Sequence, residues 1–112
     1  MHASTFAALG EPSRFQIVEL LRGGPRSVGE IVEALGIRQP QVSKHLSVLN
    51  GAGIVGVRPQ ARKRIYHLDQ ATFEELSDWV DSFERVWQTR LDSLGMYLES
   101  LDARGDDGRA ND

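Results

Sequence analysis

A stripe of large apolar residues recurs every three or four positions through the last third of the chain and constrains it more than any other feature. This spacing is that of one face of a helix, and it predicts a single helix over about residues 70–103. A helix of about thirty residues is about 45 Å long, which is more than a domain of this size can cover. The stripe therefore needs another surface, and the simplest is the same helix of a second copy. The residues of this stripe that we expect at the interface are Leu76, Trp79, Val80, Phe83, Trp87, Leu91, Leu94 and Leu98.

Charge is divided unevenly along the chain. The formal net charge is −3, but residues 1–68 carry nine Lys or Arg against four Asp or Glu, and residues 69–112 carry four against twelve. No acidic residue lies between Glu33 and Asp69. Such a stretch suits a polyanionic partner, because a carboxylate facing a phosphate would repel it. The first part therefore indicates DNA binding, and the acidic part must serve another purpose.

Two short helices joined by a tight turn are predicted over about residues 27–52. Ser27 and Glu30 have the spacing of a capping box at the start of the first helix, and Gly36 suits the left-handed conformation that follows a helix end. The second helix begins near Gln39, and its inward-facing residues are Val42, Leu46 and Leu49. This arrangement is typical of a helix-turn-helix.

A β-hairpin is predicted next, over about residues 54–68. β-branched residues flank the run from Arg58 to Arg64, so the hairpin has a basic tip and forms a wing. Pro59 cannot donate a hydrogen bond to the ladder and belongs at a strand end or a sheet edge. With Asp69 as the cap of the long last helix, the predicted fold is a mainly α winged helix-turn-helix with a two-stranded wing and a C-terminal dimerisation helix.

The outward faces of these elements supply the candidate DNA contacts. Glutamine can read adenine edges, and lysine and arginine can reach guanine or phosphate; a solvated helix face and a solubilising hairpin are the plainer interpretations. His45 is either a packed residue or a phosphate contact. The candidates on the second helix are Arg38, Gln39, Pro40, Gln41, Ser43, Lys44, His45 and Ser47. Those on the wing, with no acid nearby in the sequence, are Arg58, Arg62, Lys63 and Arg64.

Three runs carry a resemblance to a known family: Leu9 to Ile17 (LGEPSRFQI), Leu35 to Leu46 (LGIRQPQVSKHL), and Gly53 to Val55 with Arg64 to Leu68. In residue type, order and spacing they resemble the opening, the recognition segment and the wing of the ArsR/SmtB family of bacterial winged-helix repressors. The resemblance implies a homodimer joined through its first and last helices, which adds Phe6 to the expected interface. It also implies binding to an inverted-repeat operator and a block of transcription.

The chain departs from that family's pattern where metals bind. The chain has no Cys, so the family's thiolate site on the first helix of the helix-turn-helix is not matched, and residues 69–112 contain no His to match the site on the last helix. We therefore expect neither a metal site nor a cofactor. Arg38 also replaces the usual Ser cap before the recognition helix, which weakens the cap by about 1 kcal/mol and adds a cation near the DNA.

Other classes of function find little support. No nucleophile has a plausible His partner and no Gly-rich phosphate loop occurs, so we expect no enzyme and no catalytic residue. Without a signal sequence or a membrane-length apolar run, a cytoplasmic protein with no membrane partner is expected. Two alternatives stay open: a regulator with a small-molecule effector in the aromatic dimer cleft, and a winged-helix module that binds proteins only. We expect one domain over residues 1–103 and a disordered tail over 104–112.

Overall fold

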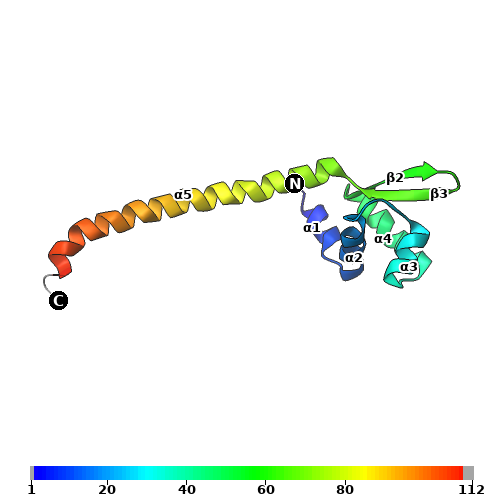
Figure 1. The fold of residues 1–112 in the computed structure, drawn as a ribbon, viewed down its shortest axis with the longest axis horizontal. Helices are drawn as coiled ribbons and strands as arrows, with labels where there is room; N and C mark the ends of the chain where they lie inside the picture. Colours follow the sequence, from blue (N-terminus) through cyan, green and yellow to red (C-terminus); the bar gives the residue numbers. More distant parts are fainter. Residues whose placement is uncertain (1, 110–112) are drawn as a thin grey trace. The chain divides into compact units, whose positions relative to one another are not determined.

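The computed structural model describes residues 2–109, and side chains up to residue 102 (Figure 1). The chain divides into two compact units, Met1–Leu76 and Ser77–Asp112, called here the N-terminal and C-terminal units. The N-terminal unit contains four short helices, a small sheet and the first turns of a long helix. In chain order the elements are α1 (Ala3–Leu9), α2 (Pro12–Leu21), β1 (Arg26–Ser27), α3 (Val28–Leu35), α4 (Gln39–Gly51), β2 (Val55–Gln60), β3 (Lys63–Leu68) and α5 (Gln70–Arg109).

The hydrophobic core belongs entirely to the N-terminal unit. Its fully buried side chains come from α2, α3, α4 and the turn after α4, and are Ile17, Ile31, Val42, Leu46, Leu49 and Ile54. Phe73, at the start of α5, packs against this core as a partly buried residue. The unit therefore builds its core from residues that precede the long apolar stripe.

The predicted helix-turn-helix is confirmed as α3 and α4. The hydroxyl of Ser27 accepts a hydrogen bond from the backbone N–H of Glu30 (3.2 Å), and the Glu30 carboxylate accepts one from the backbone N–H of Ser27 (3.0 Å), which is the predicted capping box. Gly36 ends α3 with φ of +67°, a conformation that costs glycine little. Helix α4 begins at Gln39, and Arg38 precedes it without a side-chain cap.

The wing is confirmed, but its sheet has a third strand that the sequence did not reveal. The strand order is β1-β3-β2, and both pairs are antiparallel. Strand β1 has only two residues, too few for an alternating pattern to be recognised. Pro59 lies in β2, an edge strand, as its missing donor requires.

Two short helices precede the helix-turn-helix. Helix α1 begins at Ala3, with small residues ahead of Phe6. Phe15 fits the helical spacing of α2 but is 53% exposed, because Ile17, Val18 and Leu21 face the core instead.

Helix α5 carries the stripe on one continuous helix of 40 residues. The carboxylate of Asp69 accepts a hydrogen bond from the backbone N–H of Thr72 (3.0 Å), which is the predicted cap. The helix continues to Arg109, past the predicted boundary near residue 103, because propagation adds one hydrogen bond per residue and no proline intervenes. Of the predicted tail, residues 110–112 lie outside the described residues.

The stripe is exposed to solvent in this single chain. Its members from Trp79 to Leu98 are between 41% and 60% exposed, and Phe6 on α1 is 40% exposed; Leu76 is half-buried. Within the described part of the chain, no helix is both long and apolar enough to cross a membrane.

Candidate nucleic-acid interface

Helix α4 has one face in the core and one face in solvent. Val42, Leu46 and Leu49 are fully buried, and they fix the rotation of the helix about its axis. The opposite face is mainly polar, although Val48, which borders the same hollow as Gln41 and Lys44, is 40% exposed. The predicted DNA contacts that are exposed on this face are Arg38, Gln39, Pro40, Gln41, Ser43, Lys44 and Ser47.

A groove joins this polar face to the wing. From α4 it is lined by Gln39, Ser43, Ser47 and Asn50. From α3 and the hairpin come Val28, Val57, Arg64 and Tyr66. No carboxylate lines the groove, so the sequence prediction of an acid-free surface holds here. Polar side chains of α4 and the Arg64 cation of β3 thus line one groove without a carboxylate, which is the kind of surface that can accept a polyanion.

The four wing cations lie on three segments of the hairpin. Arg58 is on β2, Lys63 and Arg64 begin β3, and Arg62 is in the turn between the strands. All four side chains are exposed. Ala61 begins the turn with φ of +56°, in the left-handed region that non-glycine residues seldom adopt. The predicted basic tip is therefore narrower than expected, since Arg58 and Arg64 lie within the strands.

One flank of the wing is less purely basic than the sequence indicates. Glu30 and Glu33 of α3 line a hollow together with Arg62, Lys63 and Arg64. Hydrogen bonds from Ser27 hold the pKa of the Glu30 carboxyl below its usual value, and the charges of Arg26 and Lys63 act in the same direction. The acid is brought there by the pairing of β1 with β3, the feature that sequence reasoning missed.

His45 is the one predicted contact on α4 that turns away from solvent. Its side chain is 19% exposed, and its Nδ1 lies 3.8 Å from a carboxylate oxygen of Glu11. That Nδ1 is buried and has no hydrogen-bond partner. Of the two interpretations left open by the sequence, the structure favours the packed one. Gln41 and Lys44 border the same hollow as Glu11, so the second flank of the α4 face also meets an acid.

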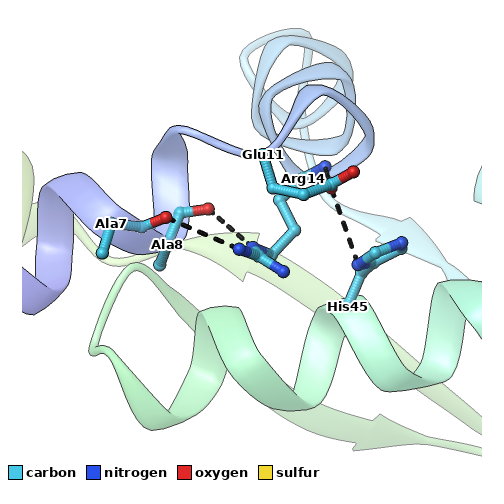
Figure 2. A network of polar contacts seen from close by, with 5 residues as sticks. All are labelled: Ala7, Ala8, Glu11, Arg14 and His45. Atoms are coloured by element: carbon cyan, nitrogen blue, oxygen red, sulfur yellow. Dashed lines mark hydrogen bonds and ion pairs between the residues drawn. The ribbon is translucent and has the colours of Figure 1, made fainter.

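Glu11 and Arg14 tie this region to α1 (Figure 2). The Glu11 carboxylate accepts a hydrogen bond from the backbone N–H of Arg14 (2.9 Å) and so caps α2. The same hydrogen bond holds the pKa of Glu11 below its usual value. The Arg14 guanidinium donates to the carbonyl oxygen of Ala8 (2.7 Å) and points toward that of Ala7, while Glu11 faces His45. The α1–α2 corner is thus bonded together beside the middle of α4.

No metal-binding constellation is present in the part of the chain that the structure describes: no three His, Asp or Glu side chains gather there. The three His residues of the sequence lie apart in the chain: His2 precedes α1, His45 is on α4 and His67 is on β3. His67 packs across the hairpin, where its Nδ1 lies 3.1 Å from the carbonyl oxygen of Leu68.

Comparisons with known proteins agree with this geometry. Residues 11–57, which span α2 to β2, match the model of a family described as bacterial regulatory protein, arsR family. The HTH-type transcriptional regulator Rv2034 of Mycobacterium tuberculosis is 38% identical over 100 residues, which are 89% of this chain and 88% of that protein. The chain belongs to the ArsR family. It is therefore a DNA-binding transcriptional regulator and not an enzyme.

Other ArsR-family proteins match over similar lengths. The transcriptional repressor SdpR of Bacillus subtilis is 29% identical over 80 residues, 71% of this chain and 89% of the repressor. Among solved structures, an ArsR-like transcriptional regulator from Rhodococcus sp. RHA1 superposes with a TM-score of 0.71 at 25% identity. The match covers 82% of this chain and 87% of that one. The winged helix of the ArsR family is thus present in both sequence and structure.

Proposed function

We propose that this ArsR-family protein is a homodimeric repressor that binds an inverted-repeat operator through α4 and the wing. The observation that carries the proposal is the groove between them. It combines Ser43 and Ser47 of α4 with Arg64 of the wing, and no carboxylate lines it. The relative SdpR, which is named as a transcriptional repressor, supports repression as the outcome of binding.

Helix α4 supplies the base contacts in this proposal. Gln39 and Gln41 read adenine edges, Lys44 reaches guanine or phosphate, and Ser43 and Ser47 serve either partner. Arg38 and Pro40 lie at the start of the helix, the end that enters the major groove in helix-turn-helix proteins. His45 contributes by packing beside Glu11 and does not contact the DNA directly.

The wing supplies the backbone contacts. The hairpin next to α4, the proposed reading helix, carries four exposed cations: Arg58, Arg62, Lys63 and Arg64. Cations on such a projection neutralise phosphates, which releases counterions and makes binding salt-dependent. Sequence is then read by α4, and the register of the protein on the duplex is fixed by the wing.

In this proposal, dimerisation through α5 gives the protein the two-fold symmetry that an inverted-repeat operator requires. Soluble monomers rarely expose a large continuous apolar patch, and pairing with a second copy would cover the stripe. Phe6 on α1 is exposed as well and joins the proposed interface. A dimer would place two recognition helices in successive major grooves, about 34 Å apart, with no metal or cofactor in the assembly.

The direct test is a gel-shift titration on the promoter upstream of the protein's own gene, after footprinting has located the site. Gln41→Ala and Lys44→Ala are each expected to weaken binding about tenfold, the effect of losing one good base contact. Gln16→Ala, an exposed substitution on α2, is the matched control and leaves binding unchanged. Unaltered affinity in both α4 variants would overturn the proposed reading helix.

A further inference from the structure

The turn that follows α4 is bonded directly to the start of α5. The hydroxyl of Thr72, in the first turn of α5, donates a hydrogen bond to the carbonyl oxygen of Gly53 at 2.6 Å. The backbone N–H of Asp69 donates to the carbonyl oxygen of Ile54 at 2.9 Å. Two consecutive carbonyls just after the reading helix are therefore held by the residues that begin the long helix.

The same turn is also held from the side of α4. Asn50, near the end of α4, donates from its side-chain amide to the carbonyl oxygen of Val55 (3.2 Å). Asp69 in turn accepts from the backbone N–H of Thr72 (3.0 Å). The junction thus links the last turn of α4, the first residue of β2 and the first turn of α5, all within the N-terminal unit.

The Thr72 hydroxyl is not required for the fold of this unit. Helix α5 is already capped by Asp69, and Thr72 does not belong to the hydrophobic core. Its hydrogen bond to Gly53 is exposed, and an exposed hydrogen bond adds little net stability because water competes for both partners. Loss of this hydroxyl should therefore leave the protein folded.

We infer that Thr72 is a positioning residue for DNA recognition: it fixes the end of α4 against the first turn of α5. This inference rests on the proposed function, a dimer joined through α5. In such a dimer, the junction is one covalent and hydrogen-bonded route between the dimer contact on α5 and each α4 helix. If the junction is stiff, the dimer should bind only a narrow range of half-site spacings. If the junction is loose, the dimer should bind several spacings with similar affinity.

The experiment measures affinity against half-site spacing. The wild-type protein first selects its inverted repeat from a randomised duplex library, and duplexes with one or two base pairs added or removed between the half-sites are then titrated. Thr72→Val, which replaces the hydroxyl by a methyl group of similar shape, is expected to bind the best spacing about twofold to threefold more weakly, the loss that a weak, exposed hydrogen bond can cause. Its affinity for the altered spacings changes little, so the spacing preference flattens.

Thr72→Ser, which keeps the hydroxyl, is expected to restore the wild-type preference, and Thr72→Ala repeats the loss with a smaller side chain. Dimerisation and thermal midpoint are expected to stay at wild-type values in all three variants. Equal losses at every spacing and on a single half-site would mean a merely structural role and overturn the inference. So would an unchanged spacing profile in Thr72→Val and Thr72→Ala. A wild-type protein that is monomeric or selects no inverted repeat would instead refute the proposed function.

Discussion

Gly56 sits where the ring of His67 occupies the space that a side chain would need. It pairs with His67 across the strands, and a Cβ at Gly56 would lie 2.5 Å from Cε1 of the His67 ring. We expect Gly56→Ala to lower the free energy of unfolding by about 1–3 kcal/mol, the usual cost of overpacking. Urea denaturation followed by circular dichroism measures the change.

Gly51→Ala is the matched control for that substitution. A Cβ at Gly51, at the end of α4, meets nothing within 4 Å, and alanine favours the helix over glycine by up to about 1 kcal/mol. The control should therefore leave stability unchanged or raise it. A Gly56→Ala variant as stable as Gly51→Ala would contradict the close packing of His67 on Gly56.

At the scale of single residues, helical spacing predicts which side chains face the core. It does not predict the contacts of residues at the edge of the buried face. Val42, Leu46 and Leu49 follow from that spacing and are all buried. His45 lies at the edge of the buried face, and its neighbour Glu11 is distant in sequence. Only the packing of α2 against α4 brings these two side chains together.

At the scale of elements, two helices depend on ionised carboxylates at their N-termini. Glu11 caps α2 and Glu30 completes the capping box of α3, and both have pKa values lowered from 4.5. Groups with a depressed pKa in the folded state stabilise it above their unfolded pKa, and this contribution is lost as pH falls through the folded value. Stability should therefore decline as the pH is lowered from about 5 toward 3.

The corresponding variant is Glu11→Gln with Glu30→Gln. It should be less stable than the wild type at pH 7, and the difference should shrink as the pH falls below 4.5, the ordinary value for these groups. Urea midpoints at several pH values provide the measurement. Glu33→Gln, on the exposed side of α3, serves as the control. A constant difference between wild type and variant across this range would exclude ionised caps.

The wing offers a prediction about salt. If Arg64 contacts a phosphate, Arg64→Ala should lower the slope of log affinity against log salt by about 0.9. Lys63→Ala should lower it less, because Glu30 lies beside Lys63 and already offsets part of its charge. Gel-shift titrations at several salt concentrations measure both slopes. Equal slopes for wild type and Arg64→Ala would place the wing away from the duplex.

Elements with strong local signals could be predicted, and those formed by distant pairing could not. The capping box, Gly36 and the start of α4 at Gln39 all follow from neighbouring residues and were found from them. Strand β1 exists only because β3 pairs with it. The position of Glu30 beside the wing depends on that strand, so it too escaped sequence reasoning.

At the scale of the whole molecule, the stripe on α5 can be tested with one added charge. Leu91→Glu places a carboxylate in the stripe and should convert a dimer to monomers, with a loss of operator affinity; sedimentation velocity and gel shifts report both. Thr89→Glu adds the same charge two residues earlier, about 200° around the helix, and should leave both properties unchanged. A dimeric Leu91→Glu protein would show that the stripe has another role.

The division of the chain into a winged helix-turn-helix and a long last helix was predictable from charge and apolar spacing, because each is a sum over many residues and tolerates local errors. The basic run before Asp69 covers α4 and the wing, and the stripe after it lies on α5. The length of α5 was less predictable, since its end beyond residue 103 has no proline or apolar boundary.

Because the N-terminal unit builds its core without the stripe, damage to α4 need not disturb the proposed dimer. In a cell making both versions, an altered subunit would capture a normal one and yield mixed pairs with a single working half. Inactivating substitutions on α4 should consequently act as dominant alleles, whereas those that disrupt the stripe should be recessive.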